Sequence, residues 1–143
     1  MLELCAMRVK RSRIIVDTNL WISYLISKGF KHLDDLILRE KAIFLFSDEL
    51  LEEFVEVAKR EKFKKYFSCD DVLKLLELFD SYGEIIKVTH QVNGCRDAKD
   101  NFLLSLAVNG KADYLITGDS DLLVLESFEN TKILTITQFE ALR

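Results

Sequence analysis

The chain lacks proline altogether, and its 143 residues include only five glycines and two histidines. No stretch rich in proline, glycine or serine divides it. We therefore expect a single domain over residues 1–143, in which residues 1–12 form a loose N-terminal extension. Neither His32 nor His90 lies near a nucleophile motif, which argues against a Ser-His-Asp triad and against a zinc site. Phosphate-binding loops of the GxxxxGKS/T or GxGxxG type are also absent.

Cysteines and long apolar runs are scarce as well. Cys5, Cys69 and Cys95 form an odd, scattered set without the paired spacing of a zinc or redox centre. We expect buried or unreactive thiols in a reducing cytoplasm. No apolar run approaches the roughly 20 residues of a membrane span, and residues 1–8 are too short and mixed for a signal peptide. The sequence thus predicts a cytoplasmic protein without a membrane segment.

Positive charge is in slight deficit, because 20 Lys and Arg residues face 24 Asp and Glu residues, for a net charge of −4. This balance argues against a strongly electrostatic DNA binder. It does not exclude nucleic acid, because a cluster of metal-binding acids lowers the net charge by itself. With 49% hydrophobic residues the chain has the composition of an ordinary globular protein.

Short apolar runs alternate with amphipathic stretches. The apolar runs predict strands at 13–16, 42–46, 84–89, 114–117 and 132–136. The spacing of apolar residues predicts helices at 20–28, 32–40, 48–58, 69–82, 97–109 and 122–127, and a last helix from 137. Because strands alternate with helices, we predict an α/β fold: a three-layer α/β/α domain with a mainly parallel sheet of about five strands.

Two of the predicted strands lead directly to an aspartate, Asp17 near the start of the chain and Asp119 near its end. Ligands of open parallel sheets bind beyond the carboxyl ends of the strands, so these two acids are expected side by side. Thr18 and Asn19 could support Asp17 by hydrogen bonds. The alternative for Asp17 is a helix N-cap, for which aspartate is favoured.

Glu53 is the glutamate of its predicted helix that is best placed to reach over the same edge. It falls about 40° outside the apolar stripe of that helix, at 100° per residue. An ordinary residue at the border of the stripe would have the same position. Both interpretations of Glu53 stay open.

Three further aspartates, together with Asp119, accompany predicted helix starts and turns. Asp97 and Asp100 lie three residues apart, which places them on one helix face, and one of the two can be a simple cap. Asp119 and Asp121 flank a serine, where a turn-forming role is common. Carboxylates about 4 Å apart repel by roughly 4 kcal/mol at an effective dielectric constant near 20. A cluster of these acids therefore needs raised pKa values or bound cations, and Mg²⁺ or Mn²⁺ suits such oxygen ligands.

With these residues in place, the chain resembles a PIN domain, and in particular the VapC-like toxin components of type II toxin–antitoxin modules. Four blocks carry the resemblance, in the expected order over residues 13–123. They are Ile15-Val16-Asp17-Thr18-Asn19, Ser47-x-x-Leu50-Leu51-x-Glu53-Phe54, Asp97-x-x-Asp100-Asn101 with Leu104-x-Leu106-Ala107, and Ala112-Asp113-Tyr114-Leu115-Ile116-Thr117-Gly118-Asp119-x-Asp121-Leu122.

The resemblance implies a metal-dependent endoribonuclease that hydrolyses RNA phosphodiesters with Mg²⁺ or Mn²⁺. It implies a cognate antitoxin protein as a partner, and members of the family often form homodimers. The implied catalytic and metal-binding quartet is Asp17, Glu53, Asp100 and Asp119, with Asp97 and Asp121 as outer metal ligands and Asn19, Ser23 and Thr117 as supporting residues.

RNA needs a cationic approach to such a site. The candidates are Lys59, Arg60, Lys62, Lys64 and Lys65, together with Arg96 and Lys99. A solvated helix face would explain the run from 59 to 65 equally well. Two alternatives to the toxin stay open: a PIN-like interaction module, and an orphan or housekeeping nuclease.

Overall fold

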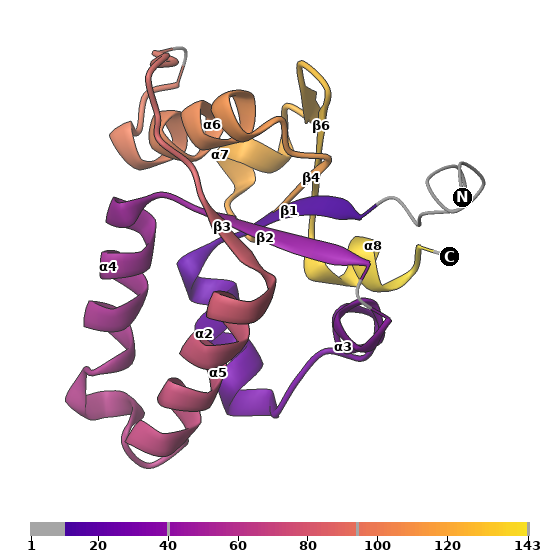
Figure 1. Cartoon of the computed structure of the whole chain (residues 1–143). Coiled ribbons are helices and arrows are strands. Elements are labelled where there is room, and N and C mark those ends of the chain that lie inside the picture. Colours follow the sequence, from indigo (N-terminus) through magenta and orange to yellow (C-terminus); the bar gives the residue numbers. More distant parts are fainter. Residues whose placement is uncertain (1–10, 40, 94, 143) are drawn as a thin grey trace.

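Six strands form one sheet in the computed structural model, which describes residues 11–39, 41–93 and 95–142 (Figure 1). Their order across the sheet is β3-β2-β1-β4-β6-β5. All neighbours pair in parallel except β5 and β6. The strands are β1 (Ser12–Val16), β2 (Ala42–Phe46), β3 (Gly83–Ile85), β4 (Tyr114–Ile116), β5 (Ser127–Phe128) and β6 (Thr131–Leu134). The predicted α/β class with a mainly parallel sheet is confirmed, and β5 is a sixth, unpredicted strand.

Helices cover both faces of this sheet. In Figure 1, α6 lies above β1 and β2, whereas α2 and α5 lie below them. The helices of the described residues are α2 (Thr18–Ser27), α3 (Lys31–Leu38), α4 (Asp48–Ala58), α5 (Cys69–Tyr82), α6 (Ala98–Gly110), α7 (Ser120–Leu123) and α8 (Ile136–Glu140), with a 3₁₀ turn, η1 (Glu61–Phe63).

Side chains that bind free backbone groups fix several helix starts. The Ser47 hydroxyl accepts a hydrogen bond from the Leu50 amide (3.2 Å), as expected for a residue that follows β2 and begins α4. At the start of α3 the acceptor comes from far along the chain. The Glu140 carboxylate, at the end of α8, accepts hydrogen bonds from the amides of His32 (2.9 Å) and Leu33 (3.1 Å). This contact joins α8 to α3.

The third strand is much shorter than the predicted 84–89. The Ile86 amide still donates to the Phe46 carbonyl (2.6 Å), but β2 ends there and α4 begins. With no strand left to pair with, the chain turns to α6, where the Asn109 side chain accepts hydrogen bonds from the amides of Thr89 (3.0 Å) and His90 (3.1 Å). The length of β3 is thus limited by the end of its neighbour β2 at Phe46.

The predicted N-terminal extension of residues 1–12 is wrong at its end, because Ser12 is the first residue of β1. Its amide donates to the Lys41 carbonyl (2.7 Å), next to β2. The rest of that prediction, residues 1–10, lies outside the described residues, as does Cys5. Cys69 is exposed and Cys95 half-buried, and both are free thiols. Among the described helices, none combines the length and the apolar character needed to cross a membrane.

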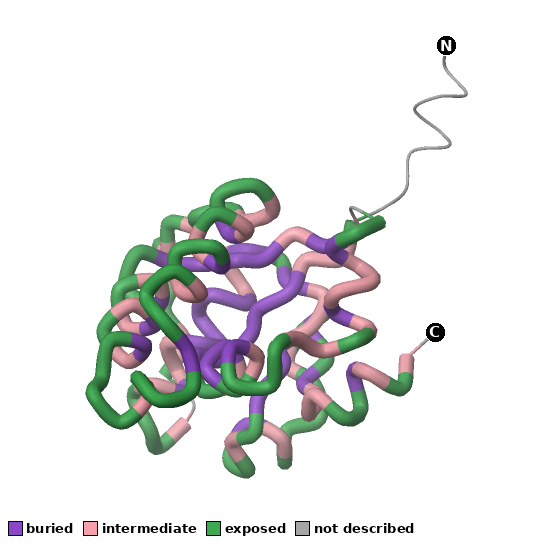
Figure 2. Tube along the Cα trace, turned by 90° about the horizontal axis from the view of Figure 1, so that it is seen from below, coloured by how far each residue is buried: buried purple, intermediate pink, exposed green. Residues whose placement is uncertain are grey.

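The core lies between the sheet and its helices, and the central strands are the most buried part of the chain (Figure 2). Trp21 of α2 packs against Phe44 and Phe79, with ring centroids 5.1 and 4.7 Å apart. On the other face α6 approaches the sheet closely at Gly110. A Cβ atom there would lie 2.8 Å from Leu45 Cδ1, so the absence of a side chain at this position favours the close approach.

Candidate metal centre

Asp17 lies at the carboxyl end of β1, immediately before α2, and only 5% of its surface is exposed. It occupies the N-cap position of α2, but its side chain makes no capping hydrogen bond. Instead, Asp17 Oδ2 accepts a hydrogen bond from the Thr117 hydroxyl (3.0 Å). The capping alternative for this side chain is therefore wrong.

Thr117 follows β4 and connects two of the acids. Its buried hydroxyl donates to Asp17 and accepts a hydrogen bond from the Asp119 amide (3.1 Å). Because β1 and β4 are neighbours, Asp17 and Asp119 follow the ends of adjacent strands. The Thr117 hydroxyl thus orients both the Asp17 side chain and the turn that carries Asp119.

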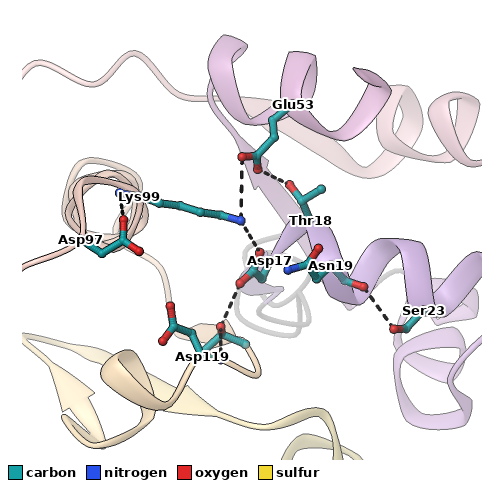
Figure 3. A network of polar contacts seen from close by, with 9 residues as sticks. Asp17, Thr18, Asn19, Ser23, Glu53, Asp97, Lys99 and Asp119 are labelled. Carbon is teal, nitrogen blue, oxygen red and sulfur yellow. Dashed lines mark hydrogen bonds and ion pairs between the residues drawn. The ribbon is translucent and has the colours of Figure 1, made fainter. Parts of the chain in front are cut away.

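Glu53 extends from α4 toward Asp17 (Figure 3). Its Oε1 accepts a hydrogen bond from the Thr18 hydroxyl (2.6 Å), so the expected support of Asp17 by Thr18 is wrong. The Lys99 ammonium lies 3.6 Å from Asp17 Oδ1 and 3.8 Å from Glu53 Oε2. The acids at this edge of the sheet form two groups, which together we call the acid centre. Asp17 and Glu53 form the first group, which we call the lysine-bridged half.

The second half, which we call the aspartate triad, consists of Asp97, Asp100 and Asp119. Each offers a carboxylate oxygen, and these oxygens lie within 4.8 Å of one another. Asp97 caps α6 by accepting from the Lys99 amide (2.9 Å), and Asp119 caps α7 by accepting from the Asp121 amide (2.9 Å). Both caps leave carboxylate oxygens directed to the same space.

Asp100 is the unusual member of the triad. It is fully buried, and neither carboxylate oxygen accepts a hydrogen bond from the described part of the chain. Burial first, and then the neighbouring carboxylates, above all that of Asp119, together raise its pKa from 3.8 to about 7. The same negative field, added to burial, raises the pKa of the Cys95 thiol.

The donor set suits a hard divalent cation. All the candidate ligands are carboxylate oxygens, the type that Mg²⁺ and Mn²⁺ prefer. Both carboxylate oxygens of Asp100 are buried without a hydrogen bond from the described residues, and such a group is costly unless a partner neutralises it. A bound cation would supply that partner.

A sequence profile of the family described as PIN domain matches residues 13–121. The chain belongs to the PIN domain family. It is also 36% identical, over 116 residues, to the uncharacterized protein MJ1680 of Methanocaldococcus jannaschii, across 79% of this chain and 74% of that protein. PIN domains are generally nucleases that use divalent metals, so membership and the acid centre together support a nuclease.

Other residues predicted for the site of this PIN domain lie at its margin. Asp121 is half-exposed and forms an ion pair with Arg96 (3.6 Å). Ser23 is exposed, and its hydroxyl donates to the backbone carbonyl of Asn19 (3.1 Å), within α2. No contact in the described structure joins Ser23 to an acid, so its supporting role stays a prediction.

The five cations of residues 59–65, which we call the basic segment, are all exposed. They lie beyond the end of α4, around η1, at the lower end of α4 in Figure 1. Lys64 pairs with Glu61 (3.0 Å), and the ammonium groups of Lys62 and Lys65 each lie 5.2 Å from the centroid of a neighbouring aromatic ring. The segment thus combines charge with aromatic faces.

The sequence reasoning missed the place of Lys99, which it assigned to RNA, and the Thr18–Glu53 hydrogen bond. A signal for Lys99 was present. A lysine in the first turn of a helix opposes the helix dipole, so another interaction must favour it there. No comparable signal marked Thr18, because its partner is set by the packing of α2 against α4.

Proposed function

We propose that this PIN domain is a metal-dependent endoribonuclease, and that it acts as the toxin of a toxin–antitoxin pair. The observation that carries the first part is Asp100: a fully buried carboxyl group without a hydrogen-bond donor, beside Asp97 and Asp119. A buried carboxyl group without a partner destabilises the fold, so its presence supports a role in binding a ligand. Membership of a family of nucleases supplies the reaction class.

In this proposal Asp17, Glu53, Asp100 and Asp119 hold Mg²⁺ or Mn²⁺ while RNA is bound and cleaved, and Asp97 and Asp121 add outer ligands. When bound, such an ion lowers the pKa of a coordinated water and neutralises charge on the phosphate. The chain's own part is to orient the ligands. Thr117 holds Asp17, Thr18 holds Glu53, and burial keeps bulk water away from Asp100.

RNA would reach the centre along exposed cations. Arg96 lies beside Asp121 at the edge of the aspartate triad, and the basic segment lies beyond the α4 helix that carries Glu53. Tyr66, 46% exposed next to Lys65, offers a face on which an unpaired base could stack. A strand bound at both places would pass over the acid centre.

The toxin role rests on the resemblance of the four motif blocks to VapC-like toxins. It predicts a cognate antitoxin protein and, as in other members of the family, a homodimer. Expression in a host without the antitoxin should arrest growth, and the Asp119→Asn variant should not. Growth that continues while the purified protein cleaves RNA would favour an orphan or housekeeping nuclease.

Cleavage itself is tested with purified protein and end-labelled single-stranded RNA. We expect cutting with Mg²⁺ or Mn²⁺, none in EDTA, and no recovery with Ca²⁺, which is larger and looser in its coordination geometry. Asp17→Asn and Asp119→Asn should abolish cutting, whereas Asp80→Asn, an exposed acid of α5, should not.

Two results would contradict the proposal. If RNA is still cut when Asp17 and Asp119 are both replaced, the activity belongs to a contaminating ribonuclease. If no RNA is cut although Mn²⁺ is bound, an interaction module becomes the better interpretation.

A further inference from the structure

The Lys99 side chain crosses from α6 to the lysine-bridged half of the centre (Figure 3). Its ammonium lies between two carboxylates from different elements, 3.6 Å from Asp17 Oδ1 and 3.8 Å from Glu53 Oε2. Both distances exceed the 2.7–2.9 Å or so of a tight charge-assisted hydrogen bond. The ammonium therefore lies between the two acids and is bound tightly to neither.

The two carboxylates need this cation for different reasons. Only 7% of the Asp17 side chain is exposed, and its Oδ1 accepts no hydrogen bond from the described residues. Glu53 is 39% exposed but directed toward Asp17. Without a positive charge between them the two acids would repel each other in a poorly solvated space.

The position of Lys99 in its helix supports a specific role. It is the second residue of α6, where the helix dipole favours acids and disfavours cations. Asp97 and Asp100 at the same helix end fit that rule, and Lys99 does not. Its ammonium is carried away from the helix end, toward acids that belong to β1 and α4.

We propose that Lys99 acts as a built-in cation that fills the lysine-bridged half of the acid centre, so that the resting protein binds a single divalent ion, at the aspartate triad. This inference rests on the proposed metal-dependent function. A second divalent ion at Asp17 and Glu53 would need the oxygens that now surround the ammonium, and the two positive charges would repel each other. Removal of the Lys99 charge therefore opens a second ion site.

The test counts bound ions and needs no cleavage. Mn²⁺ alone is titrated into RNA-free protein, and free Mn²⁺ is followed by electron paramagnetic resonance. We expect one equivalent for the wild type and for Lys99→Arg, and two for Lys99→Met, which keeps the length of the side chain without its charge. Lys74→Met, an exposed lysine of α5, is the matched control and should bind one.

A double variant keeps the result interpretable. Lys99→Met combined with Glu53→Gln should return to one equivalent, because the second site has lost a ligand. Thermal unfolding in EDTA shows whether each variant is folded before the titration. If Lys99→Met is folded and binds one ion with wild-type affinity, the built-in cation is refuted while the proposed function stands. If the wild type binds no Mn²⁺, the proposed function itself fails.

Discussion

Replacement of Asp100 by asparagine should stabilise the metal-free protein at neutral and alkaline pH, although Asp100 is a proposed ligand. The carboxyl group is fully buried and lacks a hydrogen-bond donor in the described structure. Asparagine has nearly the same shape, carries no charge, and can donate to the Asp119 carboxylate that now faces Asp100. The variant therefore relieves both desolvation and repulsion.

The pH dependence of this gain follows from the pKa of Asp100. The pKa is about 7 in the folded protein, against an ordinary value of 3.8. Between these values the folded state holds a proton that the unfolded state has lost, so wild-type stability falls as the pH rises through this window. The advantage of Asp100→Asn should be small near pH 4, grow up to about pH 7, and stay constant above that.

The size of the gain can be bounded. One pKa unit corresponds to about 1.4 kcal/mol, so a shift to about 7 is worth roughly 4 kcal/mol at most. Asp119 is only half-buried, and water near it screens part of the repulsion. We expect the free energy of unfolding to rise by about 2 kcal/mol at pH 8.

Urea denaturation in EDTA at pH 5 and pH 8 measures this difference, with Asp80→Asn as a control for the loss of one negative charge. Saturating Mn²⁺ should reverse the order, because an ion at 100 times its dissociation constant stabilises the wild type by about 2.7 kcal/mol. The reasoning is refuted if Asp100→Asn unfolds more easily than the wild type in EDTA at pH 8.

Three other substitutions test the surroundings of the centre. Thr117→Val keeps the shape but removes the hydrogen bond to Asp17, so the rate of RNA cleavage should fall about tenfold or more; an unchanged rate would show that the hydroxyl is dispensable. Alanine at all five cations of the basic segment should weaken RNA binding and flatten its dependence on salt without changing Mn²⁺ affinity; an unaltered salt slope in filter binding would place the RNA elsewhere. Glu140→Ala frees two amides of α3 and should lower the free energy of unfolding by about 1 kcal/mol, whereas Glu140→Gln should recover part of it; an equal loss for both would contradict this account.

The sheet was predictable wherever a strand is buried on both faces. The runs that became β2 and β4 are apolar throughout, β1 ends in three buried apolar residues, and the ends of all three strands were placed within a residue. The edge was not predictable in the same way. The length of β3 depends on where β2 stops, and the two-residue β5 depends on its pairing with β6. Neither relation is written in the local sequence.

Local sequence patterns identified the acids of the centre. They did not show that these acids form two groups, the lysine-bridged half and the aspartate triad. Asp97 and Asp100 share a helix start, which the spacing shows. The separation of Asp17 and Glu53 from the aspartate triad depends on the position of the Lys99 ammonium between helices on opposite faces of the sheet. A lysine among acids has the same sequence pattern whether it contacts RNA, solvent or a carboxylate. Tertiary packing decides among these.

Because α6 packs closely on the sheet at Gly110, packing at this end of the helix affects the position of the acids at its other end. Ten residues separate Gly110 from Asp100, or about 15 Å along the helix axis. The end at Gly110 rests on Leu45 and Ile86, and the other end carries Asp97, Lys99 and Asp100. A side chain at position 110 would press on the side chains of Leu45 and Ile86, and any tilt of α6 that follows would move its other end relative to Asp17 on the sheet. Mg²⁺ demands oxygens at about 2.0–2.1 Å. The spacing of the oxygens around the ion therefore depends partly on Gly110, a residue at the opposite end of α6 that contacts no ligand.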